Sequence, residues 1–167
     1  MTELAKTTDQ TVKAIADREG KYLTFSLVGE EYGIEIRKVR EIIGMMAITM
    51  VPKAPQFFKG VINLRGKVIP VVDLRLKFGM EEMGYTDRTC IIVVELHTNI
   101  MMGVVVDTVS EVLNVKAADI EETPSFGAAM NTNYILGMAK VEKGINILLD
   151  IDRVMSAQEM VILRDAA

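Results

Sequence analysis

The clearest pattern of hydrophobic and polar positions is a pair of apolar runs that flank a short basic segment. Residues 60–64 and 68–74 are rich in Val, Ile and Leu, and Arg-Gly-Lys at residues 65–67 separates them. Apolar β-branched runs on both sides of a short polar segment with Gly predict a β-hairpin with a tight turn. Asp73 then opens a segment in which apolar and basic residues alternate, and Gly79 ends it. The second strand is therefore expected to continue into one helical turn.

The plan of this hairpin recurs later in the chain. Residues 136–151 repeat it 77 positions on, with Gly137 in the place of Gly60 and Asp150 in the place of Asp73. Ordered matches at similar offsets predict two related all-β halves. Two further pairs of segments match at offsets of 70 and 69 residues, namely residues 32–43 with 102–113 and residues 23–27 with 92–96.

The rest of the first half predicts a hairpin, a short helix and a loop. Residues 22–27 and 32–36 alternate between apolar and polar side chains, and a polar turn with Gly separates them. From Arg37 onwards the apolar spacing becomes helical, so we expect a short helix that Glu41 ends. Residues 45–51 are apolar and two prolines follow, which predicts an exposed loop.

Polar segments suggest how the chain is divided. The N-terminus is rich in Thr, Ala and charged residues, and the polar segment at residues 81–87 is the predicted linker between halves. Near the C-terminus Ser156 and Glu159 form a capping box ahead of an apolar run, which predicts a docked helix. The expected parts are a flexible tail at residues 1–20, one domain at 21–167, subdomains at about 21–84 and 85–150, and a helical segment at 151–167.

Composition narrows the class of protein. The chain has 167 residues, 50% of them hydrophobic, and a formal net charge of -4. Scattered basic residues and few aromatic residues argue against a nucleic-acid partner. The longest apolar runs fall short of the roughly 20 residues of a membrane span, so no membrane insertion is expected. Without a secretory signal or a partner for Cys90, a reducing cytoplasm is the expected location.

The sequence offers little for catalysis or for metal binding. One His and one Cys cannot supply a typical four-coordinate zinc site, so no metal or other cofactor is expected. A nucleophilic pair of Cys90 and His97 is conceivable, but an apolar strand around Cys90 favours a buried, inert thiol. The glycines around Arg65 lack the spacing of a phosphate loop. Adjacent carboxylates lie in predicted turns, where solvation is the simpler interpretation.

Two features point to protein binding instead. Met is an adaptable apolar contact, and the chain contains twelve. Most of them are expected to fill the core, whereas the loop at residues 45–51 is a candidate contact surface. Glu41 and Arg65 form the second feature: if the short helix packs against the central turn, a charge-assisted pair could fix both beside an apolar groove. The alternative is that both charges simply face water.

Three segments resemble a known family. Residues 31–42, 58–75 and 104–107 closely resemble the CheW family of bacterial chemotaxis coupling proteins. The resemblance extends over about residues 22–165, and the motif from Gly60 to Asp73 is specific. The same motif occurs in the regulatory domain of the histidine kinase CheA and in the coupling half of CheV proteins. The length of this chain favours a stand-alone coupler.

The resemblance implies a fold and a function. CheW-like proteins fold as two SH3-like, five-stranded β-barrel subdomains that share a hydrophobic interior, with short helices and a C-terminal helix. They are not enzymes and need no cofactor. They join the cytoplasmic tip of methyl-accepting chemotaxis receptors to CheA, and so are cytoplasmic proteins recruited to receptor arrays at the inner face of the membrane.

The resemblance also implies which residues meet each partner. The receptor-facing residues would be Val39, Glu41, Ile42, Gly60, Asn63, Arg65, Cys90 and Ile91. Ile48 and Val51 would face the regulatory domain of the kinase, and Phe126, with Glu121 nearby, would form a second contact with it.

Two other interpretations stay open. The chain could be a small-molecule-binding β-barrel, or a coupling module of a CheV-like or other chemosensory system. In a purely structural interpretation, Arg65 is only a turn residue and the Met-rich loop is buried.

Overall fold

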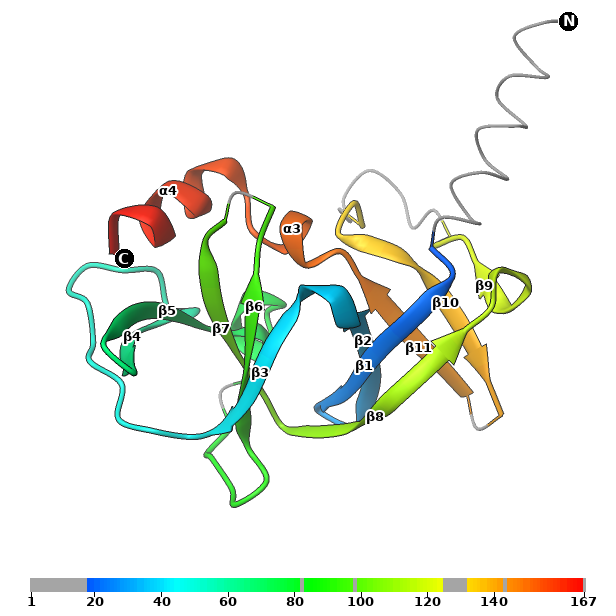
Figure 1. Ribbon diagram of the computed structural model, residues 1–167, viewed down its shortest axis with the longest axis horizontal. Coiled ribbons are helices and arrows are strands. Elements are labelled where there is room, and N and C mark those ends of the chain that lie inside the picture. Colours follow the sequence, from blue (N-terminus) through cyan, green and yellow to red (C-terminus); the bar gives the residue numbers. More distant parts are fainter. Residues whose placement is uncertain (1–17, 82, 98, 125–131, 143, 167) are drawn as a thin grey trace, which may run out of the picture.

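Two β-sheets lie side by side and make up most of the molecule (Figure 1). The computed structural model describes residues 18–81, 83–97, 99–124, 132–142 and 144–166. The six-stranded sheet, on the right in Figure 1, has the order β8-β1-β2-β11-β10-β9. Its strands are β1 (Gly20–Leu27), β2 (Glu30–Glu35), β8 (Thr108–Val115), β9 (Ile120–Glu121), β10 (Ile135–Val141) and β11 (Gly144–Leu149).

The five-stranded sheet lies on the left in Figure 1 and has the order β3-β6-β7-β5-β4. Its strands are β3 (Val39–Gly44), β4 (Phe58–Leu64), β5 (Lys67–Asp73), β6 (Cys90–Glu95) and β7 (Met101–Val106). The helical elements are η1 (Ile36–Lys38), α2 (Leu74–Lys77), η2 (Ala117–Asp119), α3 (Ile151–Val154) and α4 (Ala157–Ala166). This mainly β architecture of two subdomains confirms the predicted fold class.

The two sheets do not coincide with two successive halves of the sequence. The chain leaves the six-stranded sheet at η1, builds all of the five-stranded sheet and returns at Asp107. This differs from the expected boundary near residue 84, because residues 81–87 connect α2 to β6 within one sheet. The reason lies in pairing between distant strands: β2 pairs in parallel with β11, and β5 pairs in parallel with β7. Each sheet is therefore completed by a strand from the other half.

The predicted repeat is visible in two hairpins. In the hairpin of β4 and β5, Gly60 pairs with Val71 directly after a register shift. In the hairpin of β10 and β11, Gly137 pairs with Leu148 directly after a register shift. The residues matched in the sequence thus occupy equivalent positions in the two sheets.

An aspartate ends each of these hairpins and caps a helical turn. The carboxylate of Asp73 accepts the N–H of Arg75 at 3.0 Å at the start of α2. The carboxylate of Asp150 accepts the N–H of Asp152 at 3.1 Å at the start of α3. A short polar side chain that accepts this early N–H satisfies a donor that the helix itself leaves without a partner.

One hydrophobic interior lies between the sheets. Phe25 and Ile34 from the six-stranded sheet and Ile92 and Val104 from the five-stranded sheet belong to one cluster and are fully buried. Four aromatic rings, two in this cluster and two packed against it, stack in series with centroid separations of 5.9, 6.1 and 5.2 Å: Phe25, Tyr32, Phe78 and Tyr134. The expected shared interior is thus present, and the other two apolar clusters among the described residues are smaller.

The prediction of a short helix from Arg37 is wrong beyond its first turn. Only the three residues of η1 are helical, and β3 follows at once. Val39 and Ile42 pair with Val94 and Ile92 of β6, and the register shifts between Val39 and Glu41. The register shift interrupts the alternation of side chains between the two faces of the strand. The apolar residues of β3 therefore follow one another at intervals that resemble those of a helix.

The C-terminal helix confirms the predicted capping box. The N–H of Ser156 donates to Glu159 Oε1 at 2.7 Å, and the N–H of Glu159 donates to Ser156 Oγ at 3.2 Å. Leu163 is buried in the shared core and Met160 packs against it, while Val161 and Ile162 remain exposed. Only part of the predicted apolar face is therefore used for docking.

An ion cluster stabilises the segment through which the chain returns to the six-stranded sheet. We call it the Arg75 cluster, and it contains Asp73, Arg75 and Asp107. The guanidinium of Arg75, which is 1% exposed, makes two hydrogen bonds to Asp73, at 3.1 and 3.0 Å, and one to Asp107, at 3.1 Å. Asp107 also accepts the N–H of Val28, in the turn between β1 and β2, at 2.7 Å. The cluster therefore connects α2 of one sheet to a turn of the other.

A second ion cluster stabilises the segment through which the chain first leaves the six-stranded sheet. We call it the Lys38 cluster, and it contains Lys38, His97 and Asp152. Lys38 Nζ lies 2.7 Å from Asp152 Oδ2. Asp152 Oδ1 accepts the N–H of His97 at 2.7 Å and lies 2.9 Å from His97 Nδ1. Because His97 lies between β6 and β7, this cluster connects α3 of the six-stranded sheet to η1 and a turn of the five-stranded sheet.

We expect Arg75→Met to destabilise the fold by about 3–5 kcal/mol, since Asp73 would remain buried without its counter-ion. Urea unfolding followed by circular dichroism would measure the change. Arg153→Met is the matched control: Arg153 is largely exposed and pairs with Asp150 at 3.4 Å. Its loss should stay within about 1 kcal/mol. A loss below about 1 kcal/mol for Arg75→Met as well would contradict the importance of the cluster.

The Lys38 cluster should make the stability of the fold sensitive to acid. Burial alone would raise the pKa of Asp152, but the hydrogen bonds from Lys38 and His97 outweigh burial and hold the pKa below its ordinary 3.8. A carboxyl group whose pKa is lowered by folding stabilises the native state above its unfolded pKa, and that contribution is lost as the pH falls through the folded pKa.

The free energy of unfolding should therefore decrease from about pH 5 to about pH 2 more steeply for the native sequence than for Asp152→Asn. Urea titrations at several pH values would give both curves. Parallel curves would mean that folding leaves the pKa of Asp152 unchanged.

Candidate functional site

An exposed ion pair joins the two edges of the five-stranded sheet. Glu41 lies on β3 and Arg65 lies in the turn between β4 and β5, while β3 and β4 are the outermost strands of the sheet. Arg65 Nη1 donates to Glu41 Oε2 at 3.3 Å, and Nη2 donates to Oε1. The hydrogen bond to Glu41, and then its negative charge, raise the pKa of Arg65. The expected pair is therefore present, although Glu41 belongs to a strand and not to a helix.

The turn that carries Arg65 has the geometry of a tight hairpin. Leu64 pairs with Lys67, so the loop contains only Arg65 and Gly66. Both residues have positive φ, at 51° and 87°, as a two-residue turn of this type requires. Asn63 Oδ1 accepts the N–H of Gly66 at 2.9 Å. Asn63 thus fixes the turn, and the turn presents the Arg65 side chain to solvent.

The residues expected to face a receptor differ in their accessibility. Ile42 is 46% exposed, Asn63 and Arg65 are exposed, and Val39, Glu41 and Cys90 are half-buried. Ile91 is fully buried and Gly60 is buried, so these two residues have no surface to offer and support the face from within.

Close packing explains why glycine occupies position 60. The residue has a φ of 137°, and a Cβ placed on it would overlap the carbonyl oxygen of Thr49. Thr49 and Val61 exchange two backbone hydrogen bonds of 2.9 Å, which draw the loop between β3 and β4 onto β4. A larger residue at position 60 would push this loop away.

The loop at residues 45–51 is less exposed than its sequence suggests. Met45, Met46 and Ile48 pack against the small apolar cluster of the five-stranded sheet, and Val51 packs against the shared core. Only Met50, which is 82% exposed, stands out as a large exposed hydrophobic residue of the loop. The backbone bridge to β4 accounts for the difference, because it holds the loop against the sheet.

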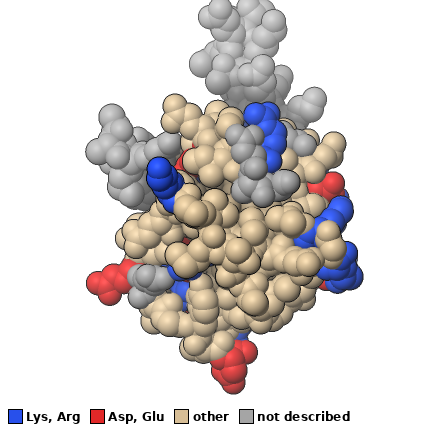
Figure 2. Space-filling model, turned by 90° about the vertical axis from the view of Figure 1, so that its left-hand side faces the viewer, with Lys and Arg blue, Asp and Glu red and all other residues tan. Residues whose placement is uncertain are grey.

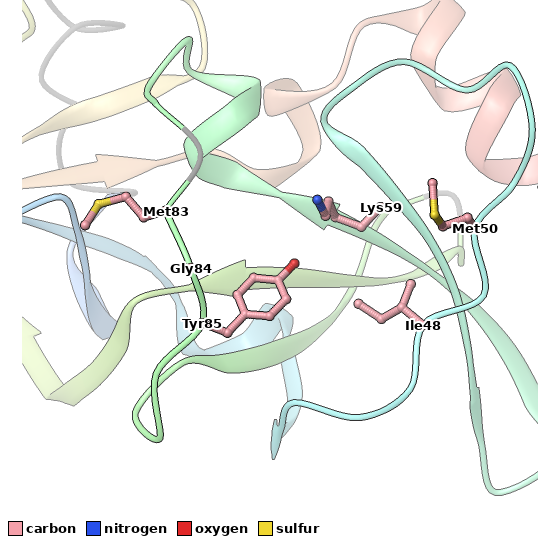
Figure 3. A pocket seen from close by; sticks show the side chains of 6 residues that line it. All are labelled: Ile48, Met50, Lys59, Met83, Gly84 and Tyr85. Atoms are coloured by element: carbon pink, nitrogen blue, oxygen red, sulfur yellow. The ribbon is translucent and has the colours of Figure 1, made fainter.

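An open hollow of about 350 Å³ lies beside Met50. Figure 3 shows Ile48 and Met50 on one side, Lys59 of β4 above, and the segment with Met83 and Tyr85 on the other side. The sequence did not identify Met83 or Tyr85, because their segment was interpreted as a linker. The sequence does contain one signal for this site, because Met83 and Tyr85 are large apolar residues within a polar segment.

The face on the left of Figure 1 is mostly uncharged. Figure 2 shows it from the front, with few Lys, Arg, Asp or Glu side chains near its centre and most of them at its margin. A centre depleted of charged residues is typical of protein interfaces.

The second expected kinase contact lies on the other sheet. Glu121 belongs to β9, the outer strand of the six-stranded sheet, and its carboxylate lies 3.1 Å from Lys140 Nζ. Phe126 lies outside the described residues. Glu121 therefore lies on the six-stranded sheet, whereas Ile48 lies in the loop that packs against the five-stranded sheet.

The described residues show no arrangement for catalysis or for metal binding. Among them, no group of three or more His, Cys, Asp or Glu side chains could hold a metal ion. Burial raises the pKa of the Cys90 thiol, so the neutral, unreactive form is favoured. His97 is mostly exposed and contacts Asp152. No helix in the described part of the chain is long and apolar enough to cross a membrane.

Comparison with known proteins gives a consistent family. Residues 21–159 match the family described as the CheW-like domain. The chain is 39% identical over 147 residues to the chemotaxis protein CheW of Klebsiella aerogenes, with 88% of each chain covered. It is 35% identical over 131 residues to that of Bacillus subtilis, covering 78% of this chain and 81% of the relative.

A solved structure agrees with this result. The crystal structure of the scaffolding protein TtCheW from Thermoanaerobacter tengcongensis matches with a TM-score of 0.77 and 34% identity, covering 86% of this chain and 98% of that one. With its two sheets, its shared interior and its matching sequence, the chain belongs to the CheW family of chemotaxis coupling proteins.

Proposed function

We propose that this chain is a non-enzymatic adaptor that joins the cytoplasmic tip of methyl-accepting chemotaxis receptors to the regulatory domain of the histidine kinase CheA. It acts in the cytoplasm, at receptor arrays on the inner face of the membrane. The observation that carries the proposal is the ion pair of Glu41 and Arg65, which joins the two edges of the five-stranded sheet; the next residue of β3, Ile42, is also exposed. Family membership supplies the class of partner.

The receptor contact uses one end of the five-stranded sheet. A receptor tip is helical, and an amphipathic helix binds a surface that combines apolar contacts with a few directed polar groups. Ile42 and the half-buried Val39 and Cys90 offer apolar area, while Arg65 offers a planar group with five donors. Glu41 holds the guanidinium in one orientation, which reduces the entropy lost on binding.

The kinase contact uses the uncharged face and a second point on the other sheet. Ile48 and Val51 shape the loop from within, and Met50 is the side chain that a partner would meet first. The neighbouring hollow has room for an apolar side chain of the kinase. Glu121, together with Phe126, forms the second contact, so each adaptor touches two kinase domains.

Coupling then follows from simultaneous binding. If receptor binding changes the affinity for the kinase, kinase binding must change the affinity for the receptor by the same factor. The adaptor needs no chemistry of its own for this role; it needs two faces that can be occupied at the same time.

Arg65→Glu should weaken binding of a receptor signalling fragment about tenfold or more, because it removes the donors and places a second carboxylate beside Glu41. Binding of the kinase regulatory domain and thermal stability should change little, since Arg65 is exposed. Isothermal titration with each partner would separate the two effects.

The double variant Glu41→Arg with Arg65→Glu tests whether the pair or the arginine matters: it restores the ion pair but moves the guanidinium. Receptor binding should remain weak. If Arg65→Glu weakened binding of both partners equally and also unfolded the protein, the assignment of Arg65 to the receptor contact would be contradicted.

Met50→Glu should weaken binding of the kinase regulatory domain about tenfold and leave receptor binding unchanged, because a carboxylate would replace the exposed apolar side chain of the proposed contact. Val112→Glu is the matched control, since Val112 is an exposed apolar residue of β8 on the other sheet. Titration of each variant with the regulatory domain would measure the change. Identical affinities for both variants would remove Met50 from the interface.

A further inference from the structure

The two ion clusters occupy related positions in the repeat. Arg75 and Asp152 each lie two residues after the aspartate that caps a helical turn. Each reaches the segment through which the chain passes from one sheet to the other: Arg75 pairs with Asp107 after β7, and Asp152 pairs with Lys38 of η1. The polarity is opposite, since the helical turn supplies the cation in one cluster and the anion in the other.

Each cluster also holds a turn of the opposite sheet. Asp107 accepts the N–H of Val28 in the turn after β1, and Asp152 accepts the N–H of His97 in the turn after β6. Val28 and His97 are 69 positions apart, which is the offset between the matching strands that precede them. The same backbone position is therefore used twice, once on each sheet.

Burial makes these contacts stronger and more directional than ordinary surface pairs. In the pairs that join the two sheets, the side chains of Arg75 and Asp107 are 2% and 26% exposed, and those of Lys38 and Asp152 are 17% and 14% exposed. By contrast, the hydrophobic core between the sheets has no preferred direction. The clusters are thus the contacts best suited to fix how one sheet is rotated relative to the other.

That rotation matters for the proposed function, on which this inference rests. The two proposed kinase contacts lie on different sheets, at the loop containing Ile48 and on β9 with Glu121. Each contact alone depends on its own sheet. An ordered assembly depends on the angle between the two sheets as well.

We propose that the Arg75 and Lys38 clusters set the angle between the docking faces, and that Lys38 and Asp107 are positioning residues for assembly and not binding residues. Their loss leaves each pairwise interaction intact and removes the coupling between receptor and kinase.

The first test uses the full-length chain with Lys38→Met and Asp107→Asn, each of similar size to the native residue. Glu95→Gln is the matched control, because Glu95 pairs with Arg40 within the five-stranded sheet. Titrations with the receptor fragment and with the regulatory domain should agree with the native protein within about twofold. Receptor-dependent stimulation of the kinase should fall about tenfold in the two cluster variants, within the usual range of coupling, and stay unchanged in the control.

Lys38→Arg provides the rescue, because it retains the charge facing Asp152 and should restore stimulation. Unchanged stimulation in both Lys38→Met and Asp107→Asn would overturn the proposal. Equal losses in pairwise binding and stimulation would also overturn it, because the residues would then act in binding or in folding.

A second measurement needs no partner. Spin labels at Val68 and Ile145, exposed residues of β5 and β11, would report the distance between the sheets in a Cys90→Ala background. The distance distribution should broaden in the Lys38→Met and Asp107→Asn variants but not in Glu95→Gln. An unchanged distribution would overturn the inference. Failure of the native chain to bind either partner would instead refute the proposed function and leave this result standing.

Discussion

The buried guanidinium of Arg75 is the constraint on which the joint between the sheets depends. Asp73 is completely buried and so is tolerated as an anion only beside a counter-ion, and Arg75 supplies it with two parallel hydrogen bonds. The remaining Nη1 donor reaches Asp107, where the chain returns to the six-stranded sheet. One side chain therefore links the cap of α2, the end of β7 and, through Asp107, the turn between β1 and β2.

A repeated supersecondary unit has taken on unequal tasks. Both sheets contain the same hairpin followed by a capped helical turn, but the residue after the first strand's end differs: Arg65 in the hairpin of the five-stranded sheet corresponds to Glu142 in the hairpin of the other sheet. In each sheet the segment that precedes this hairpin also pairs with its first strand: Thr49 pairs with Val61 in one sheet, and β9 pairs with β10 in the other. The duplicated framework supplies rigidity, and the differences between its loops supply the surfaces for partners.

Local patterns in the sequence were sufficient for local structure. The hairpin around Arg65, the helical turn that Asp73 opens and the capping box of Ser156 and Glu159 could be predicted, because each depends on neighbouring residues with a recognisable pattern. The pair of Glu41 and Arg65 remained one of two interpretations, because these residues are 24 positions apart. The pairing of β2 with β11 and of β5 with β7 could not be predicted, because the sequence of an apolar strand does not specify a distant partner. The burial of Arg75 could not be predicted either, because the segment after Asp73 shows only alternating apolar and basic residues and the partner Asp107 lies 32 positions away. The strand at Glu41 was missed because its irregular register imitates helical spacing.

The strand order also has a consequence for biosynthesis. Every strand of the five-stranded sheet lies between Val39 and Val106, so this sheet can form while later residues are still being translated. The six-stranded sheet must wait, because its central strand β2 pairs with β11, more than a hundred positions further on. Until β11 arrives, one side of the β1 and β2 hairpin has no partner, and an unpaired strand edge promotes aggregation. The nascent chain is therefore most prone to aggregation after its first hairpin has emerged and before its last hairpin has emerged.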